Sequence, residues 1–268
     1  MIAYDATNKR LAMFTREATP DFWDEQWSKD ELLKNIQSGT TYHFLKSITA
    51  KHIPAGGRIL EGGCGTGQVV FCLDAWGYEA YGVDYAARTV EIVRELVPKL
   101  RIRVGDVRHL DFPNSFFDGY WSLGVIEHFW EGFDPITKEA VRVLKPGGTL
   151  FLTFPWMSPL RRLKAGLGLY PDVGSTQEIG TFYEFMLDRR AVVRTLESQG
   201  FSCVEFMPYD ALKGLKDEIP FLHPMLKKLY KSKTRVARAI RYALTMLFAQ
   251  LTGHMILLVC KKSSFASR

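Results

Sequence analysis

A glycine-rich loop is the feature that most restricts how this chain can fold. Residues 61–67 are Glu-Gly-Gly-Cys-Gly-Thr-Gly and separate a short apolar run from a helical pattern. Glycine has no Cβ, so it adopts the positive φ angles of a tight turn and lets a ligand approach the backbone. The helix that follows offers unpaired N–H groups at its N-terminus. The loop therefore predicts a strand, a turn and a helix beside a bound small molecule.

The same strand-then-helix pattern recurs along the chain, and tracts of low complexity are absent. Strands alternating with helices at this spacing favour an α/β fold, a parallel sheet with helices on both faces. The predicted strands are Arg58–Gly62, Glu79–Asp84, Arg101–Val104, Phe117–Leu123, Thr149–Phe154, Phe201–Met207 and Met255–Lys262. The predicted helices are Thr41–Lys51, Gly67–Trp76, Ala86–Val97, Pro135–Leu144 and Arg189–Gln199.

The length of 268 residues suits one large domain, or a domain with a sizeable insertion. We expect a helical lid over 1–53, in which Tyr4, Trp23 and Trp27 either cover a ligand or pack on the core. The main domain is expected over 54–268, with a basic helical insertion at about 208–253. The N-terminus lacks a secretory signal pattern. The four cysteines form no C-x-x-C pair, which favours free thiols in a reducing cytoplasm.

Three acidic residues stand at the ends of the first three predicted strands of the sheet. These are Glu61, Asp84 and Asp106. Ligands of open α/β sheets bind at the carboxyl edge of the strands, so the three side chains are expected near the loop. An acid at such a place can also cap the next helix. A nicotinamide site is excluded because G-x-G-x-x-G fails in both registers, which end on Gln68 and Val70.

Several segments together resemble the class I S-adenosylmethionine-dependent methyltransferases. Residues 59–67 are similar to the first motif of that family, 116–128 to its fourth-strand motif, and 143–148 to the turn before its fifth strand. The resemblance, closest to small-molecule enzymes of ubiquinone biosynthesis, implies a Rossmann-like, seven-stranded, mostly parallel sheet. Its last strand is antiparallel and inserted between strands five and six.

The resemblance also implies S-adenosylmethionine as the cofactor and a set of residues that contact it. Glu61 would pair with the ammonium group of the cofactor, Asp84 would accept hydrogen bonds from its ribose, and Asp106 from its adenine. The full set of expected contacts is Glu61, Gly62, Gly63, Cys64, Gly65, Gly67, Asp84, Tyr85, Asp106, Val107 and Leu123.

His128 is the best-placed candidate for a catalytic base. It follows the fourth predicted strand, and an imidazole titrates near neutral pH. Glu127 could orient it, or His128 could simply hydrogen-bond the backbone. No metal-ligand cluster is evident, so no metal is expected. We expect oxygen methylation of a small-molecule or lipid- or glycan-linked acceptor; nitrogen or carbon methylation and a non-catalytic, cofactor-binding paralogue remain alternatives.

The positive charge of the chain is concentrated in one stretch. Residues 211–241 hold nine Lys and Arg against two acids, whereas the rest of the chain is nearly neutral, so no nucleic-acid partner is expected. Apolar residues at helical spacing follow, with a break at 232–234 and a stripe formed by Met225, Leu229, Val236, Ile240, Leu244, Leu247 and Leu251. The stripe either packs on the sheet edge as a lid or makes peripheral contact with the inner membrane surface through 221–251.

Overall fold

The computed structural model describes residues 1–25, 36, 43–175 and 181–264. These residues form two compact units. The first consists of residues 1–16, 153–192 and 206–257, and the second of residues 17–152, 193–205 and 258–268. Each unit combines segments that are distant in the sequence. The division at residue 53 that the sequence suggested therefore stays a prediction.

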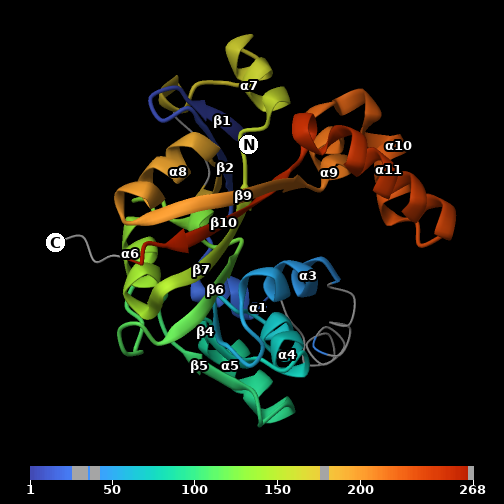
Figure 1. Ribbon diagram of the computed structural model, residues 1–268. Coiled ribbons are helices and arrows are strands. Elements are labelled where there is room, and N and C mark those ends of the chain that lie inside the picture. Colours follow the sequence, from blue (N-terminus) through green and yellow to red (C-terminus); the bar gives the residue numbers. More distant parts are fainter. Residues whose placement is uncertain (26–35, 37–42, 176–180, 265–268) are drawn as a thin grey trace. The chain divides into compact units, whose positions relative to one another are not determined.

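The main sheet has seven strands and confirms the predicted fold class. The strand order is β5-β4-β3-β6-β7-β10-β9, and β3 pairs in parallel with both β4 and β6. The last strand, β10, lies between β7 and β9 and is antiparallel to β7 (Figure 1). The strands are β3 (Arg58–Gly62), β4 (Glu79–Asp84), β5 (Arg101–Val104), β6 (Phe117–Leu123), β7 (Leu144–Pro155), β9 (Phe201–Tyr209) and β10 (Met255–Lys262).

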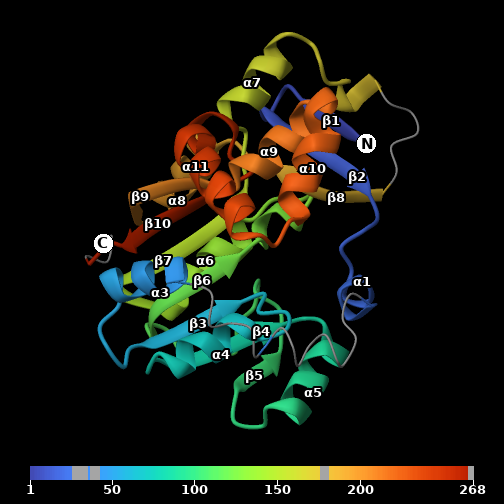
Figure 2. The ribbon, with the colours of Figure 1, turned by 90° about the vertical axis from the view of Figure 1, so that its right-hand side faces the viewer.

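Helices flank this sheet, as Figures 1 and 2 show. They are α3 (His43–His52), α4 (Gln68–Ala75), α5 (Ala87–Leu96), α6 (Asp134–Val143) and α8 (Arg189–Ser198). Between the layers the buried Trp121 ring stacks on Phe151 at 4.2 Å. Its indole N–H donates to the hydroxyl of Thr49, which satisfies the polar atom of this side chain inside the core.

The register of the central strands brings their carboxyl ends together. Gly62, at the end of β3, is opposite Val83 on one side and Ser122 on the other. Loops that follow β3, β4 and β6 therefore meet at one edge of the sheet, where ligands bind in folds of this class.

The first fifteen residues correct the expected helical segment. They form β1 (Ile2–Asp5) and β2 (Arg10–Thr15), which join β8 (Thr181–Met186) in an antiparallel three-stranded sheet. The Asp5 carboxylate closes the hairpin by accepting hydrogen bonds from Asn8 and Arg10. Tyr4 packs within this sheet unit. Helix α1 (Pro20–Glu25) follows, whereas Trp27 and residues 41–42 lie outside the described residues.

Strand β7 begins earlier than predicted. It starts at Leu144 rather than Thr149 and so includes the Pro-Gly-Gly segment that was expected as a turn. Leu144 already has extended backbone angles, φ −74° and ψ 140°. Proline is tolerated near the start of a strand, where a missing N–H costs few ladder bonds.

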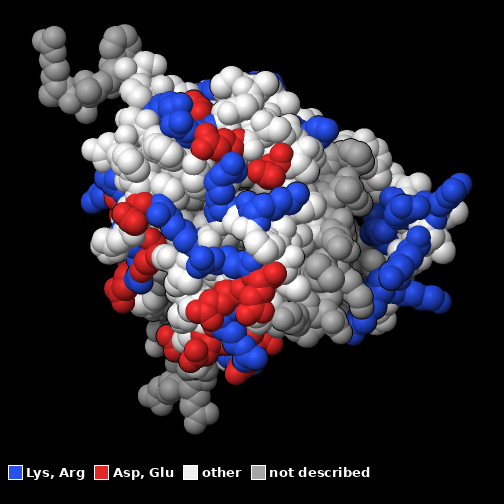
Figure 3. Space-filling view, turned by 90° about the horizontal axis from the view of Figure 1, so that it is seen from below, with Lys and Arg blue, Asp and Glu red and all other residues white. Residues whose placement is uncertain are grey.

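The basic segment is helical and has the predicted break. Its elements are α9 (Ala211–Glu218), the short 3₁₀ helix η4 (Pro220–Leu222), α10 (His223–Lys231) and α11 (Arg235–Thr252). Thr234 caps α11 by accepting a hydrogen bond from the N–H of Ala237. Figure 3 shows, on its right, a group of Lys and Arg side chains over α10 and α11 without Asp or Glu among them.

Of the two interpretations of the apolar stripe, packing on the sheet edge does not hold for most of its residues. Val236, Leu247 and Leu251 are more than half exposed, and Ala237, Leu226 and Ala249 are buried in their place. Helix α11 contacts α9 and α7 (Pro159–Gly166), and its largest apolar side chains stay exposed. Within the described residues, no helix has the length and apolar character to cross a bilayer.

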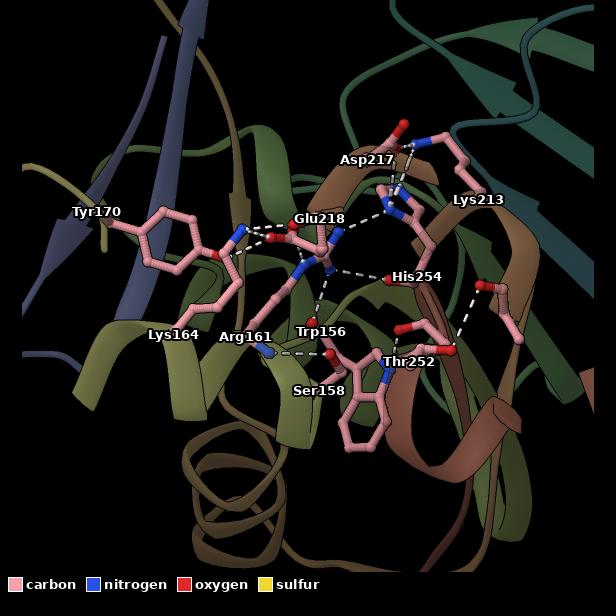
Figure 4. Close-up of polar contacts among 12 residues, drawn as sticks. Trp156, Ser158, Arg161, Lys164, Tyr170, Lys213, Asp217, Glu218, Thr252 and His254 are labelled. Atoms are coloured by element: carbon pink, nitrogen blue, oxygen red, sulfur yellow. Dashed lines mark hydrogen bonds and ion pairs between the residues drawn. The ribbon is translucent and has the colours of Figure 1, made fainter. Parts of the chain in front are cut away.

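A buried polar cluster joins three segments of the first unit (Figure 4). Arg161, on α7 (Pro159–Gly166), donates from Nε to Glu218 of α9 at 2.8 Å. Its other nitrogens contact the carbonyl oxygen of Trp156 and the Nδ1 atom of His254, each at 2.8 Å. Lys164 adds a 2.7 Å ion pair to the same Glu218. Each guanidinium nitrogen of Arg161 thus has a hydrogen-bond partner, as burial of a guanidinium requires.

Two of the four cysteines do not match the expectation of free thiols. Cys203 on β9 and Cys260 on β10 form a disulfide between neighbouring strands. Cys64 and Cys72 are free and buried. The pairing could not be predicted from the sequence because the two partners lie 57 positions apart.

Candidate active site

The glycine loop adopts the conformation that its composition predicted. Gly63, Gly65 and Gly67 have φ angles of 74°, 46° and 69°, a region that disfavours other residues. The N–H groups of Gly63 and Cys64 donate to the carbonyl of Val83, which fixes the loop on β4. A Cβ atom at Gly63 would lie 2.5 Å from Val125, whereas one at Gly65 would enter open space. The loop therefore presents bare backbone to the space beside it.

That space is a pocket formed entirely by residues of the second unit. Of the predicted cofactor contacts it is lined by Gly63, Gly65, Asp84, Tyr85, Asp106, Val107 and Leu123, and the predicted base His128 also lines it. Sequence reasoning did not assign Ala86, Thr89, Gly105, Arg108, Gly124, Val125 and Phe129 to the site. Most of these are next to predicted residues, and that adjacency was the available signal.

Four of the predicted contacts do not line the pocket. They are Glu61, Gly62, Cys64 and Gly67. Glu61 is buried and accepts a hydrogen bond from the N–H of Val70 in α4, and burial raises its pKa well above the usual value. Gly62 faces the Tyr120 hydroxyl, which leaves no room for a Cβ. These residues shape the loop from behind, and a direct cofactor contact by any of them remains a prediction.

Asp84 braces the loop and faces the pocket. Its Oδ2 accepts from the N–H of Gly65 at 2.7 Å, and its Oδ1 from the N–H of Ala86 at 2.9 Å. Burial raises the pKa of Asp84, although these backbone hydrogen bonds oppose the shift. Each carboxylate oxygen has a second lone pair, so Asp84 can still accept a hydroxyl donor from a ligand.

Asp106 is paired with a neighbour that the sequence reasoning missed. Arg108 donates to both carboxylate oxygens at 2.7 to 3.0 Å. Burial alone would raise the pKa of Asp106, but the hydrogen bonds from Arg108 outweigh it and lower the pKa. The Arg108 guanidinium also lies 5.3 Å from the centre of the Phe129 ring. Asp106, Arg108 and Phe129 thus form a pocket wall with an ion pair and an aromatic ring.

A short N-terminal segment of the second unit covers part of the pocket. Trp23 of α1 lines it and meets the His128 ring edge-to-face, with ring centres 5.4 Å apart. The neighbouring Asp24 accepts from the N–H and the hydroxyl of Thr89, both at 2.7 Å. The Tyr85 hydroxyl donates to the carbonyl of Ala18. Trp23 thus lies at the pocket, whereas a lid over the whole of 1–53 stays a prediction.

His128 ends a 3₁₀ turn, η2 (Ile126–His128), after β6. Its ring is half-buried in the pocket wall, and its backbone N–H donates to Val125. Glu127, beside it, is buried. The imidazole is thus placed to meet a molecule that enters the pocket, on the side where Trp23 lies.

The residues present fit an amino-acid sulfonium linked to a nucleoside. The open space at Gly65 accepts a ligand against bare backbone. Asp84 and Asp106 supply acceptors for hydroxyl and amino groups, and Val107 and Leu123 supply apolar contacts for a flat ring.

Comparison with known proteins agrees with this geometry. Residues 60–152 match the family described as a methyltransferase domain. This segment belongs to the S-adenosylmethionine-dependent methyltransferases. The family implies S-adenosylmethionine as the cofactor of the pocket.

Two relatives show how far the similarity extends. A Mycolicibacterium smegmatis protein named "Probable S-adenosylmethionine-dependent methyltransferase" is 35% identical over 104 residues, 39% of this chain and 40% of that protein. The ubiquinone biosynthesis O-methyltransferase of Xanthomonas axonopodis is 31% identical over 132 residues, 47% of this chain and 52% of the enzyme. The chain thus spans about half or less of the length of these methyltransferases.

Solved structures share the fold of this methyltransferase domain at low identity. A complex of the Haloferax volcanii Trm112 methyltransferase activator with a methyltransferase gives a TM-score of 0.58 at 18% identity, over 92% of this chain and 97% of that one. The [4+2]-cyclase SpnF gives 0.53 at 19% identity, over 83% and 81% of the two chains.

Proposed function

We propose that this chain transfers a methyl group from S-adenosylmethionine to an oxygen atom of a small-molecule or lipid- or glycan-linked acceptor. The observation that carries the proposal is one pocket that combines the bare glycine backbone, Asp84, Asp106 and His128. The named O-methyltransferase of ubiquinone biosynthesis among the relatives supports the choice of oxygen.

The reaction requires no covalent intermediate between the chain and the methyl group. Bound S-adenosylmethionine supplies a methyl group that is already activated by its sulfonium. The chain must hold the acceptor oxygen at near-attack distance and exclude water. Trp23 and Phe129 provide the apolar cover for that purpose. His128 removes the proton of the acceptor hydroxyl, which makes the oxygen a better nucleophile.

A different reaction in the same pocket is the second candidate. A Talaromyces variabilis relative, 32% identical over 108 residues, is named as an S-adenosyl-L-methionine-dependent Diels-Alderase, and SpnF is a cyclase with this fold. Methylation of nitrogen or carbon and loss of catalysis are further alternatives.

Calorimetric titration with S-adenosylmethionine, followed by acceptor pools and methyl-labelled cofactor, tests the proposal. We expect saturable binding and label in an ether or ester product. Binding without any labelled product favours the cyclase or the non-catalytic alternative. Failure to bind the cofactor would refute the proposed function altogether.

Replacement of His128 tests its role as the base. In His128→Gln the cofactor affinity should persist, because the backbone and Asp84 are unchanged, while turnover falls about 10²-fold or more. Single-turnover rates measured from pH 5.5 to about 9 provide the readout. Wild-type rates should rise with pH as the imidazole loses its proton, and this rise should disappear in the variant. An unaltered rate would remove His128 from the mechanism.

The location is part of the same proposal. A lipid-linked acceptor would place the chain in the cytoplasm at the inner membrane surface, with contact through residues 221–251. The net positive charge of that segment supports this location. If the cofactor pocket and the membrane contact through 221–251 are independent, the affinity for S-adenosylmethionine should be the same with and without vesicles.

A further inference from the structure

The outer face of α11 is apolar and exposed over the length of the helix. At 100° per residue, the buried residues Ala237, Ala249 and Thr252 share one side. The opposite side carries five large apolar side chains that are 43% to 72% exposed. They are Val236, Ile240, Met246, Leu247 and Leu251. An apolar face of this extent on one helix indicates a binding surface, because isolated exposed apolar residues would be scattered.

Helix α10 adds a basic surface to the same helical pair. Lys227, Lys228 and Lys231 are exposed, while Leu226 is its buried residue. Arg241 of α11 donates to the carbonyl oxygens of Leu229 and Ser232 at 2.8 and 2.6 Å. It thereby fastens α11 to the C-terminal end of α10, where a cation is favourable. The lysines and the apolar face therefore belong to one fastened unit.

The charge of this surface has one sign only. Seven Lys and Arg lie between Ile219 and Thr252, and the sequence has no Asp or Glu after Glu218. Figure 3 shows these cations grouped without acidic neighbours. Because no acid within the pair neutralises them, these cations form a positive surface that is complementary to an anionic partner.

An anionic lipid surface matches both properties better than the other candidates. A nucleic acid would need aromatic platforms, whereas the large exposed apolar side chains of α11 are aliphatic except for Tyr242 and Phe248. A second copy would bring the same face against itself and place like charges together. Helices with a large apolar face and flanking Lys and Arg lie in the plane of a bilayer interface.

We propose that α10 and α11 dock on the surface of an anionic phospholipid bilayer. The apolar face of α11 enters the boundary between headgroups and acyl chains, and Lys227, Lys228 and Lys231 bind lipid phosphates. The proposal rests on the peripheral location included in the proposed function, and it requires no turnover. It names the residues that make the contact.

Vesicle co-sedimentation of the full chain tests the docking. We compare vesicles of phosphatidylcholine alone with vesicles of phosphatidylcholine and phosphatidylglycerol, at low salt and at about 0.5 M salt. The expected result is binding to the anionic vesicles only, weakened at least tenfold by the salt. Absence of binding at low salt overturns the proposal, as does equal binding to both kinds of vesicle.

Matched variants distinguish binding through α10 and α11 from a general effect of positive charge or exposed apolar side chains. Leu247→Ser and the triple variant Lys227→Gln, Lys228→Gln, Lys231→Gln should each lose at least tenfold in binding. Val204→Ser, at another exposed apolar site, and the triple variant Lys9→Gln, Lys99→Gln, Lys138→Gln, at exposed sites elsewhere, should bind as wild type. Equal losses in both sets would refute the assignment to α10 and α11.

Two further measurements keep the outcome decisive. Sedimentation velocity would reveal a dimer; a dimer dispersed by Leu247→Ser would mean that the face binds a second copy and would overturn the lipid assignment. Release of the chain from vesicles by detergent alone, with no effect of salt, would also overturn the proposal, because the lysines would then not bind lipid phosphates. Thermal unfolding of every variant confirms that it is folded. Calorimetric titration of the wild type with S-adenosylmethionine separates the two proposals. Vesicle binding without cofactor binding supports the docking and contradicts the methyl transfer, and cofactor binding without vesicle binding does the opposite.

Discussion

Single residues of the glycine loop differ in what they contribute to the pocket. Gly63 and Gly65 both have positive φ, but only Gly65 would carry a Cβ into open space. A side chain at Gly63 would instead strike Val125. Ligand affinity and loop strain can therefore be separated best at Gly65.

Gly65→Ala should lose cofactor affinity beyond its cost in stability. The left-handed backbone costs alanine about 1–2 kcal/mol, and the new methyl group also occupies ligand space. We expect a weakening of S-adenosylmethionine binding of at least tenfold by calorimetry. Gly56→Ala is the control, since Gly56 has φ 72° with nothing within 4 Å and is not a lining residue. Comparable affinities in the two variants would exclude Gly65 from the cofactor site.

Among the elements, the six-residue helix α1 depends on its attachments. A helix this short is not stable alone. Asp24 anchors it by accepting hydrogen bonds at the first turn of α5, where a negative charge is favourable. Because Trp23 is the next residue and lines the pocket, the anchor also sets the position of the pocket wall.

Asp24→Ala should loosen this wall. Loss of the charged cap costs about 1 kcal/mol, which corresponds to roughly a fivefold weaker cofactor affinity if the lid closes on the bound ligand. Quenching of tryptophan fluorescence on cofactor addition should also fall. Asp21→Ala, at an exposed acid on the same helix, is the matched control. The anchor role fails if both variants bind as tightly as wild type.

At the scale of the whole molecule, the buried cluster around Arg161 predicts how stability depends on pH. Burial, and then the charges of Arg161, Lys213 and Lys216, lower the pKa of His254 to about 2. The unfolded imidazole takes up a proton below about pH 6.5. Between these two values the unfolded state binds more protons, so stability falls as pH falls. By pH 5 the loss from His254 amounts to roughly 2 kcal/mol.

Urea unfolding at pH 7.5 and at pH 5 measures this linkage. The free energy of unfolding of His254→Gln should depend less on pH than that of wild type, because the variant has no imidazole at this position. Some dependence remains, since carboxylates such as Glu218 titrate in both proteins. His223→Gln, at an exposed site, should follow the wild type. Parallel pH curves for wild type and His254→Gln would show that this imidazole does not contribute.

The disulfide between Cys203 and Cys260 can be tested by thiol labelling, and the result bears on the cytoplasmic location. Thiol labelling of the unfolded, unreduced chain should modify two cysteines, Cys64 and Cys72, and reduction should expose all four. Closing a loop of 57 residues should stabilise the fold by about 4 kcal/mol, which reduction would remove. Disulfides are uncommon in a reducing cytoplasm. Four labelled thiols without reductant would indicate that the pair is reduced, as the cytoplasmic location requires.

Much of the sheet and part of the pocket could be predicted from local sequence. Strands β3, β4, β5, β6 and β10 have the predicted bounds, since buried parallel strands appear as short apolar runs between turn residues. The glycine loop and Asp84 were found because a positive φ and a strand-end acid are local requirements.

Contacts between distant segments were decided only by the tertiary structure. The strand pairing of residues 11–15 with 181–186, the contact of Trp23 with His128, and the disulfide each join partners far apart in the chain. The same holds for α11: its sequence predicted an amphipathic helix, but burial depends on which neighbours approach. Helix α11 contacts α9 and α7, its residues Ala237, Ala249 and Thr252 are buried, and its large apolar side chains are exposed. Periodicity determines that a helix has two faces, and only packing determines which face is covered.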